Sequence, residues 1–249
     1  MLDKKIYNET FHVGRNELTR YAARKIINQI LDISPISSVV DVGGGIGVWL
    51  DECKKQMGAN FSYGFVLDGN YIDDKEKLVN KDQFIVYDLE NKLNLDDKFD
   101  LVICLEVAEH LSKERAEGFV EDLTKLGDFV LFSAAIPYQG GNGHINEQPV
   151  SYWIELFAKR GYEAYDIIRP NIYMDQNIPF WYRNNIMVYC NKNSTLCEKL
   201  QNLSMPPMYD IVTLDVYRNK AECLDIFMNS RAYRGFSKLL AIINKLVKK

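Results

Sequence analysis

The chain has 249 residues, of which 26% are charged and 47% hydrophobic, which is typical of one large globular domain or of one domain with an appendage. Its formal net charge of −4 gives no electrostatic reason to expect a nucleic-acid partner. The five cysteines include no C-x-x-C pair, which argues against a disulfide framework and a zinc site. The polar N-terminus argues against a signal peptide, and the lack of a long apolar run argues against a transmembrane segment. We therefore expect a cytoplasmic protein.

Short apolar runs alternate with segments of helical periodicity along most of the chain. The apolar runs predict strands at 38–42, 63–67, 84–87, 100–105, 129–133, 162–168 and 185–190. The periodic segments predict helices at 17–31, 48–56, 112–126 and 151–160, the first of them capped by Asn16. This alternation predicts an α/β fold with a mostly parallel sheet and right-handed crossovers.

The domain organisation follows from the same pattern. We expect an N-terminal helical lid or entry segment at 1–37, an α/β core at 38–193 and a helical extension at 194–249. The stretch 236–247 has apolar residues on one helical face. That face is expected to pack against the body or against a second copy of the chain in a homodimer; the alternative is a helix lying on a membrane surface.

A glycine-rich turn follows the first strand, in the sequence VVDVGGGIGVWL at 39–50. Glycines at 43, 45 and 47 allow positive φ angles, and the helix N-terminus after them offers free N–H groups to a carboxylate or a phosphate. The spacing is G-x-G-x-G after Asp41, with Val48 where the dinucleotide-binding pattern G-x-G-x-x-G has its third glycine or alanine. The spacing therefore disfavours an NAD-dependent oxidoreductase.

Acidic residues end three further strands of the predicted sheet. Asp68 is placed to accept the hydroxyls of a ribose, and Asp88 to accept from an adenine amino group, while Glu106 ends the fourth strand. Because ligands of open α/β sheets bind beyond the carboxyl ends of the strands, Asp41, Asp68, Asp88 and Glu106 are expected to line one crevice.

The motifs DVGGGIG, the strand-end Asp68, YDL at 87–89 and CLEVAEHL at 104–111 together resemble those of class I S-adenosylmethionine-dependent methyltransferases. The resemblance covers residues 39–191. It implies a Rossmann-like, seven-stranded, mostly parallel sheet with helices on both faces and a late antiparallel hairpin ending in NNIMVYC. It also implies cofactor roles: Asp41, Gly43, Gly45 and Gly47 hold the methionine part, Asp68 the ribose, Asp88 with Leu89 the adenine, and Glu106 lies beside the sulfonium.

Histidines are the expected proton acceptors for methyl transfer, because a hydroxyl is a poor nucleophile until it loses its proton. His144, in the loop after the fifth predicted strand, is our candidate general base, and His110 and Glu109 are the alternatives. The same loop supplies candidate substrate-binding residues, and its glycines give it freedom to fold over a substrate. These residues are Tyr138, Gln139, Asn142, Asn146 and Glu147. We expect no metal site, since no metal-ligand spacing is evident.

The stretch at 134–162 resembles methyltransferases of bacterial polysaccharide and secondary-metabolite pathways. This resemblance implies O-methylation of a sugar, with a nucleotide-activated sugar such as a GDP-heptose destined for a capsule as the first candidate. Another small polar acceptor (a phosphoramidate, a carboxylate or an amine) and a cofactor-binding module without turnover remain as alternatives.

Overall fold

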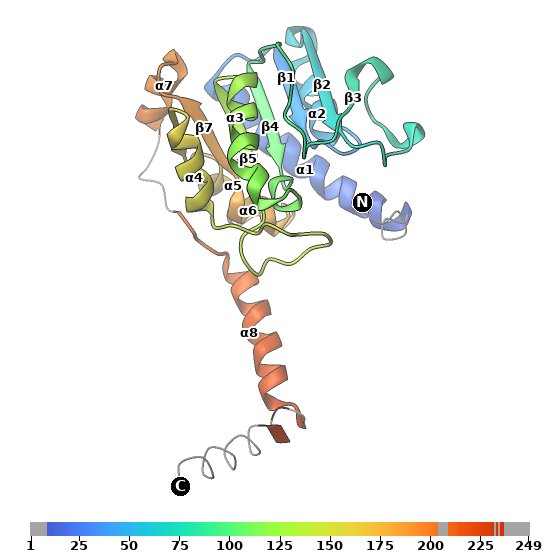
Figure 1. The fold of residues 1–249 in the computed structure, drawn as a ribbon, viewed down its shortest axis with the longest axis vertical. Helices are drawn as coiled ribbons and strands as arrows, with labels where there is room; N and C mark the ends of the chain where they lie inside the picture. The colour runs from blue at the N-terminus through green and yellow to red at the C-terminus, as the bar shows by residue number, and fades with distance from the viewer. Residues whose placement is uncertain (1–8, 204–208, 232, 234, 237–249) are drawn as a thin grey trace. The chain divides into compact units, whose positions relative to one another are not determined.

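Seven strands form a single sheet in the computed structural model, which describes residues 9–203, 209–231, 233 and 235–236 (Figure 1). Their order in the sheet is β3-β2-β1-β4-β5-β7-β6. The strands are β1 (Ser38–Val42), β2 (Tyr63–Asp68), β3 (Phe84–Val86), β4 (Leu101–Leu105), β5 (Phe129–Ser133), β6 (Tyr162–Tyr165) and β7 (Met187–Asn191).

The pairing confirms a mostly parallel sheet with a late antiparallel hairpin. Strand β1 pairs in parallel with β2 and β4, and the parallel pairing continues from β4 to β5. Strand β7 lies antiparallel between β5 and β6. The strand order reverses direction between β1 and β4, and this is the point where open α/β sheets place their ligands.

Helices cover both faces of the sheet. The helices around the sheet are α1 (Glu9–Ile33), α2 (Val48–Met57), α3 (Ala116–Leu126), α4 (Val150–Lys159), α5 (Arg169–Ile172), α6 (Phe180–Asn185) and α7 (Thr195–Leu203). A further helix, α8 (Leu214–Asn229), follows later in the chain. One apolar core joins α1, α2 and the segments around α5 to α7 to one face, and a second joins α3 and α4 to the other.

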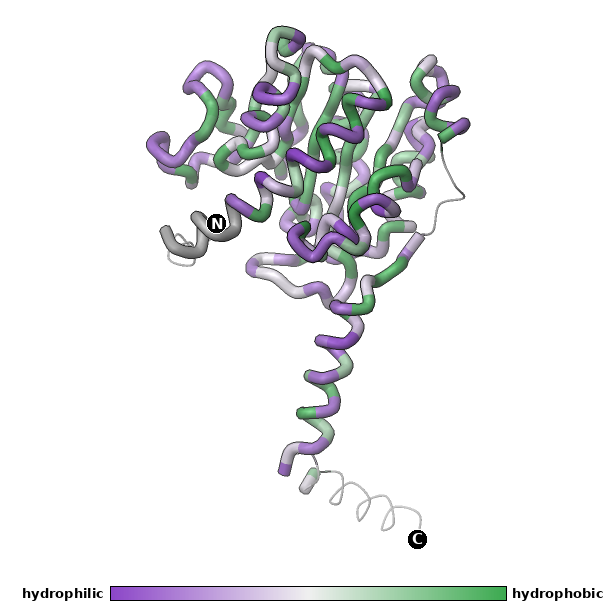
Figure 2. The backbone as a smooth tube through the Cα atoms, turned by 180° about the vertical axis from the view of Figure 1, so that it is seen from behind, coloured by the Kyte–Doolittle hydropathy of each residue, from purple (hydrophilic) through white to green (hydrophobic). Residues whose placement is uncertain are grey.

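The strand sequences supply both cores because successive side chains point to opposite faces. In β4, Leu101 and Ile103 belong to the first core, whereas Val102 and Cys104 belong to the second. Figure 2 shows the hydrophobic residues gathered along these strands. Burial on both faces explains why the strands read as continuous apolar runs.

Several element boundaries differ from the prediction. Helix α1 begins at Glu9 and not at 17, because no proline or turn signal interrupts residues 9–16 and Gly14 alone costs only about 1 kcal/mol in a helix. Helix α3 begins at Ala116 after a 3₁₀ turn, Lys113–Arg115. Ser112, where the predicted helix begins, hydrogen-bonds through its hydroxyl to Glu90 and does not cap the helix.

The chain divides into two compact units, Met1–Ile211 and Val212–Lys249. Helix α7 lies in the first unit, where Cys197 and Leu200 are buried in the core beside β6 and β7. Helix α8 lies in the second unit. Of the apolar stretch predicted at 236–247, only Phe236 is among the described residues.

Within the described part of the chain, none of the helices is both long enough and apolar enough to span a bilayer.

Candidate active site

The glycine turn joins β1 to α2 as the sequence predicts. Gly43, Gly45 and Gly47 have φ angles of 74°, 57° and 89°, the left-handed region in which a side chain is unfavourable. A Cβ atom on Gly43 would lie 2.4 Å from a methyl group of Val107, so the glycine turn packs directly against the turn that follows β4. A Cβ atom on Gly45 would meet no described atom within 4 Å, which leaves open space above the turn.

Asp68 closes this turn at the end of β2. Its carboxylate accepts hydrogen bonds from the backbone N–H groups of Gly45 and Gly69, each at 2.6 Å, and from the Tyr71 hydroxyl. Burial nevertheless raises the pKa of Asp68, and the three hydrogen bonds only partly oppose this rise.

Asp41 lies inside β1, not at its end, and is 2% exposed. Burial, and then the charge of Asp68, raise the pKa of Asp41 to about 8. Its Oδ2 has no hydrogen-bond partner among the described residues, and a Cβ atom on Gly44 would lie only 2.3 Å from it. Asp41 therefore lies against the glycine turn.

Asp88 and Leu89 follow β3 with opposite exposures. The Asp88 side chain is exposed and accepts a hydrogen bond from the backbone of Glu90, whereas Leu89 is buried. Arg115 holds this segment in place by donating to the backbone oxygens of Leu89 and Asn91. The acid predicted to contact adenine is thus accessible, on an anchored loop.

Glu106 follows β4 directly and has a φ angle of 57°, which is unusual for a residue with a side chain. Its carboxylate accepts from the side-chain amides of Gln139, at 2.8 Å, and Asn185, at 3.2 Å. The amide of Asn185 also donates to Gln139 at 2.8 Å. Gln139, predicted to bind substrate, therefore belongs to a network around Glu106.

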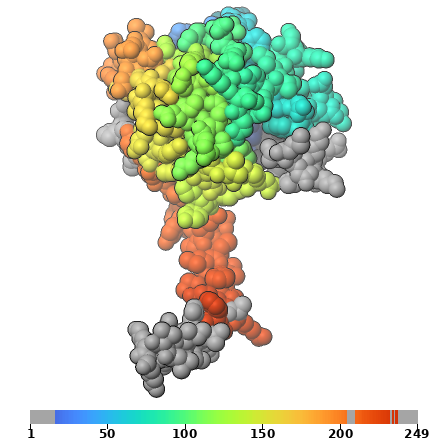
Figure 3. Space-filling view, viewed as in Figure 1, coloured from blue at the N-terminus to red at the C-terminus, as the bar shows by residue number. Residues whose placement is uncertain are grey.

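The loop between β5 and α4 lies at the surface (Figure 3). It carries His144 to the turn after β4. The carbonyl oxygen of Glu109 accepts from the backbone N–H groups of Ile145 and Asn146, at 2.9 and 3.0 Å. The Asn146 side chain is buried and bonds to the Ala108 carbonyl and to Gln148. Asn146 therefore attaches the loop to the body, while Tyr138 and Asn142 are exposed.

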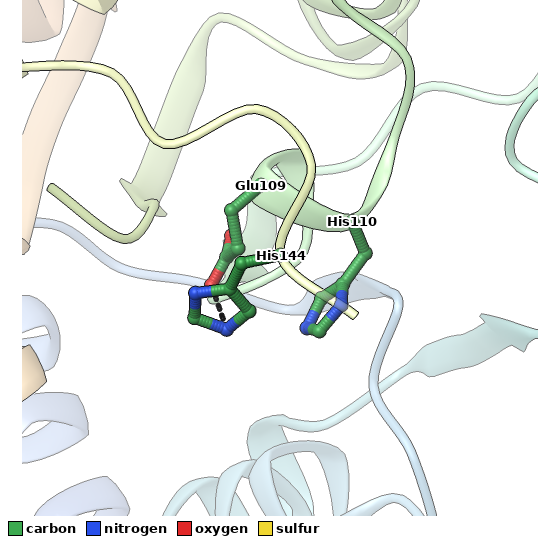
Figure 4. Close-up of side chains that lie close together, drawn as sticks. All are labelled: Glu109, His110 and His144. Carbon is green, nitrogen blue, oxygen red and sulfur yellow. Dashed lines mark ion pairs between the residues drawn. The ribbon is translucent and has the colours of Figure 1, made fainter. Parts of the chain in front are cut away.

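All three candidate proton acceptors meet at this point, and Figure 4 shows them projecting toward the same space. The Nε2 atom of His144 lies 4.0 Å from Oε1 of Glu109. The rings of His110 and His144 are perpendicular, with centroids 4.8 Å apart. The structure thus brings together the three residues that the sequence offered as alternatives.

Glu147 orients the His144 ring. Its carboxylate lies 3.0 Å from Nδ1 of His144 and also accepts from the backbone N–H groups of Tyr138 and Gly140. Burial raises the pKa of Glu147, but these hydrogen bonds outweigh it and hold the pKa below its ordinary value. An ionised Glu147 places the proton of His144 on Nδ1, so the lone pair on Nε2 points toward Glu109.

Glu109 is fully buried, and within the described part of the chain neither of its carboxylate oxygens has a hydrogen-bond partner. Burial, and next the charge of Glu106, raise its pKa well above the ordinary value.

Two residues of the site were not predicted from the sequence. Tyr71 bonds to Asp68 from the loop after β2, and Asn185, at the end of α6, joins Glu106 to Gln139. Asn185 comes close to Glu106 only because β7 pairs with β5, and no local signal in the sequence indicates this contact.

Comparisons with known proteins agree with this fold. Residues 15–117 match a family model described as a methyltransferase domain. Human N-acetylserotonin methyltransferase, solved with S-adenosylmethionine, shares 14% identity and a TM-score of 0.51 over 73% of this chain and 55% of its own. The methyltransferase domain of bacterial CtHen1-C shares 18% identity and a TM-score of 0.50 over 70% of this chain and 98% of its own.

A third solved structure is the O-methyltransferase NcsB1 from neocarzinostatin biosynthesis, with S-adenosylhomocysteine and 1,4-dihydroxy-2-naphthoic acid. It shares 16% identity and a TM-score of 0.50 over 73% of this chain and 58% of its own. The chain therefore spans little more than half the length of NcsB1 and of the human enzyme. No curated protein sequence matches the chain. At these identities the structural likeness establishes the fold.

Proposed function

We propose that this chain is an S-adenosylmethionine-dependent methyltransferase that methylates a hydroxyl group of a sugar. A nucleotide-activated sugar, such as a GDP-heptose of a capsular pathway, is the first candidate acceptor. The observation that carries the proposal is the contact between Gly43 and Val107, which places the glycine turn and the Glu109–His110–His144 cluster side by side at one edge of the sheet. The methyltransferase-domain match and the shared fold support the same reaction class.

The residues at this edge fit S-adenosylmethionine. The open space above Gly45 accommodates the methionine part, and the unpartnered oxygen of Asp41 lies against the turn, where it can accept a hydrogen bond from the amino group. The carboxylate of Asp68 would exchange the Tyr71 hydroxyl for a ribose hydroxyl, and the exposed Asp88 would accept from adenine. Bound there, the cofactor supplies a methyl group on a sulfonium that is itself a good leaving group.

The chain's own contribution is to position the acceptor and to receive its proton. A sugar hydroxyl has a pKa near that of water, about 15, so it attacks poorly until the proton is withdrawn. In the simplest form of the reaction, Nε2 of His144 takes that proton while the oxygen attacks the methyl carbon in line. The carbon–oxygen bond forms as the carbon–sulfur bond breaks, and the electron pair stays on sulfur.

The loop after β5 supports a polar acceptor. Tyr138 and Asn142 are exposed on it, and Gly140 and Gly143, with φ angles of 76° and 75°, give its backbone conformations that other residues avoid. An oxygen acceptor also agrees with NcsB1, a structural neighbour described as an O-methyltransferase.

The test is mass spectrometry after incubation with S-adenosylmethionine and a panel of nucleotide-activated sugars, heptoses included. We expect a product one methylene heavier. No product from any sugar, with S-adenosylhomocysteine binding measured by calorimetry, would contradict the sugar acceptor and favour a phosphoramidate, a carboxylate or an amine. Failure to bind S-adenosylhomocysteine would contradict the whole proposal.

The substitution Asp68→Ala tests the cofactor part of the proposal. We expect it to weaken S-adenosylhomocysteine binding at least tenfold, because it removes the carboxylate that meets the ribose hydroxyls, a loss of about 1.4 kcal/mol or more. An unchanged calorimetric affinity would remove the ribose assignment.

A further inference from the structure

Glu109, His110 and His144 form a group with the chemistry of a metal site. One ligand atom from each residue lies within 4.8 Å of the other two. Two imidazole nitrogens and one carboxylate oxygen are the donors that divalent transition-metal ions prefer. Among the described residues, these three form the one group of His, Cys, Asp or Glu side chains whose ligand atoms all lie this close together.

We propose that Glu109, His110 and His144 bind a divalent transition-metal ion, and that the acceptor of the methyl group binds to this ion through neighbouring hydroxyl groups. The second half of this statement rests on the proposed function, whereas the first half does not.

The condition of Glu109 is the independent observation that points to a cation. Its side chain is fully buried, neither carboxylate oxygen has a hydrogen-bond partner among the described residues, and the carboxylate faces the His144 ring (Figure 4). Buried carboxylates are normally paired or coordinate a metal, because an uncompensated one is costly.

The two histidines are oriented as metal ligands are. Nδ1 of His144 lies 3.0 Å from a Glu147 oxygen, and Nδ1 of His110 lies 3.3 Å from the carbonyl oxygen of Gly143. Both contacts place the ring proton on Nδ1 and the lone pair on Nε2. An oxygen that holds the far nitrogen of a ligating histidine is the usual support of such sites.

The distances require a small closure of the site. Metal–ligand bonds of about 2.0–2.2 Å place two neighbouring ligands about 3.0–3.5 Å apart, whereas Nε2 of His144 and Oε1 of Glu109 are 4.0 Å apart. Side-chain rotation and the glycine-rich loop that carries His144 can supply this movement. A Cβ atom on Gly141 would lie 2.2 Å from Nε2 of His144, so the loop leaves room for the ring only because this residue is glycine.

A bound ion would change the role assigned to His144. Three protein ligands leave open positions on a six-coordinate ion, and neighbouring sugar hydroxyls can occupy two of them. An ion held by these residues would lower the pKa of a coordinated hydroxyl group, whose proton would pass to water as the oxygen attacks the methyl carbon. His144 then acts as a ligand of the ion and not as the base.

The test uses the full-length protein stripped with a chelator, with Mn²⁺, Co²⁺ and Zn²⁺ each titrated separately by calorimetry in the absence of acceptor. We expect one ion per chain. Glu109→Gln and His144→Ala should each weaken ion binding at least about tenfold, with S-adenosylhomocysteine affinity preserved. Glu155→Gln, which removes an exposed carboxylate on α4, is the matched control and should bind the ion as the wild type does.

Failure of all three ions to bind, or binding that neither variant weakens, would overturn the metal site. Circular dichroism of each variant separates loss of binding from loss of fold, and His110→Ala provides a third variant if one of the others does not fold. Ion binding without S-adenosylhomocysteine binding would contradict the proposed function but leave the metal site intact. S-adenosylhomocysteine binding without ion binding would contradict the metal site but leave the proposed function intact.

Discussion

Gly141 shows how one missing side chain positions the candidate catalytic histidine. A Cβ atom there would lie 2.2 Å from Nε2 of His144, which is far inside contact distance. We therefore expect Gly141→Ala to displace the imidazole and to lower kcat at least tenfold, since a misplacement of about 1 Å can cost about 100-fold. S-adenosylhomocysteine affinity should be unchanged.

A matched glycine-to-alanine control is available for this variant. A Cβ atom on Gly235 would meet no described atom within 4 Å, so Gly235→Ala should behave as the wild type. Steady-state kinetics with the acceptor identified by mass spectrometry make the comparison. Normal kcat in Gly141→Ala would mean that the position of His144 does not matter to the reaction.

Asp41 makes the stability of the ligand-free protein depend on pH. Its pKa is about 8 in the folded chain, against 3.8 for a free side chain, because burial and then the charge of Asp68 disfavour ionisation. The folded state therefore holds the proton more tightly than the unfolded state. The stabilisation is fully present below pH 4 and is lost as pH rises toward 8, by at most about 1.4 kcal/mol per pH unit.

Asp41→Asn removes this titration without changing the size of the side chain. Its thermal unfolding temperature should fall less between pH 5 and pH 8 than that of the wild type, which leaves the variant relatively more stable at the upper end. Calorimetric scans of both ligand-free proteins across this range measure the difference. Parallel curves would show that Asp41 ionises normally in the folded chain.

The separate residues of the site were more predictable than their contacts. Asp68 and Glu106 could be placed because parallel strands bring their carboxyl ends to one edge of the sheet. The link from Glu106 to Asn185, which are 79 residues apart in sequence, could not be placed, since it depends on β7 pairing with β5. The closeness of His144 to Glu109 could not be predicted either, because His144 reaches Glu109 through the fold of its loop and not through sequence spacing.

At the scale of elements, the strand predictions were accurate and the ends of helices less so. The strand at Phe129–Ser133 was predicted without error, because its apolar run is buried on both faces and ends at a polar loop. The strand predicted at 162–168 ends at Tyr165, since Asp166 pairs instead with Arg169 at 2.7 Å and the chain turns into α5. Such an ion pair is not visible in an apolar pattern.

Arg115, just before α3, tests how one element supports the cofactor edge. Its guanidinium donates to the backbone of Leu89 and Asn91 and to the buried Asp122, which in turn accepts from the backbone of Leu93. Arg115→Ala leaves these acceptors and the Asp122 charge without this partner. We expect unfolding to become easier by about 1–3 kcal/mol, and S-adenosylhomocysteine to bind several-fold more weakly as the loop bearing Asp88 loosens.

Arg160 is the matched control for this variant, because its guanidinium pairs with Glu117 and Glu121 at the surface. Such pairs contribute about 0–1 kcal/mol, so Arg160→Ala should leave cofactor affinity unchanged. Urea unfolding and calorimetry compare the two variants. Equal effects of the two substitutions would mean that the loop after β3 does not depend on Arg115.

At the scale of the whole molecule, the assigned site residues and the described cores all lie in one of the two units. The first unit, residues 1–211, contains both described cores and every residue assigned to the cofactor, the acceptor and the metal ion. Helix α8 of the second unit exposes large apolar side chains. These are Leu214, Tyr217, Leu224, Ile226, Phe227 and Met228. In the first unit, α7 contributes Cys197 and Leu200 to the first core.

A chain truncated after Ile211 separates these contributions. Because both cores remain, we expect it to fold cooperatively, to bind S-adenosylhomocysteine within about threefold of the full-length affinity and to bind the same metal ion. Calorimetry and thermal unfolding of the two proteins provide the measurement. The control is a chain truncated after residue 191, which lacks α7. We expect this control to be less stable, because it loses the buried side chains of Cys197 and Leu200. If truncation after Ile211 abolished cofactor binding in a folded protein, the second unit would have to complete the site. If the cofactor bound normally and only acceptor turnover were lost, the second unit would instead serve acceptor recognition.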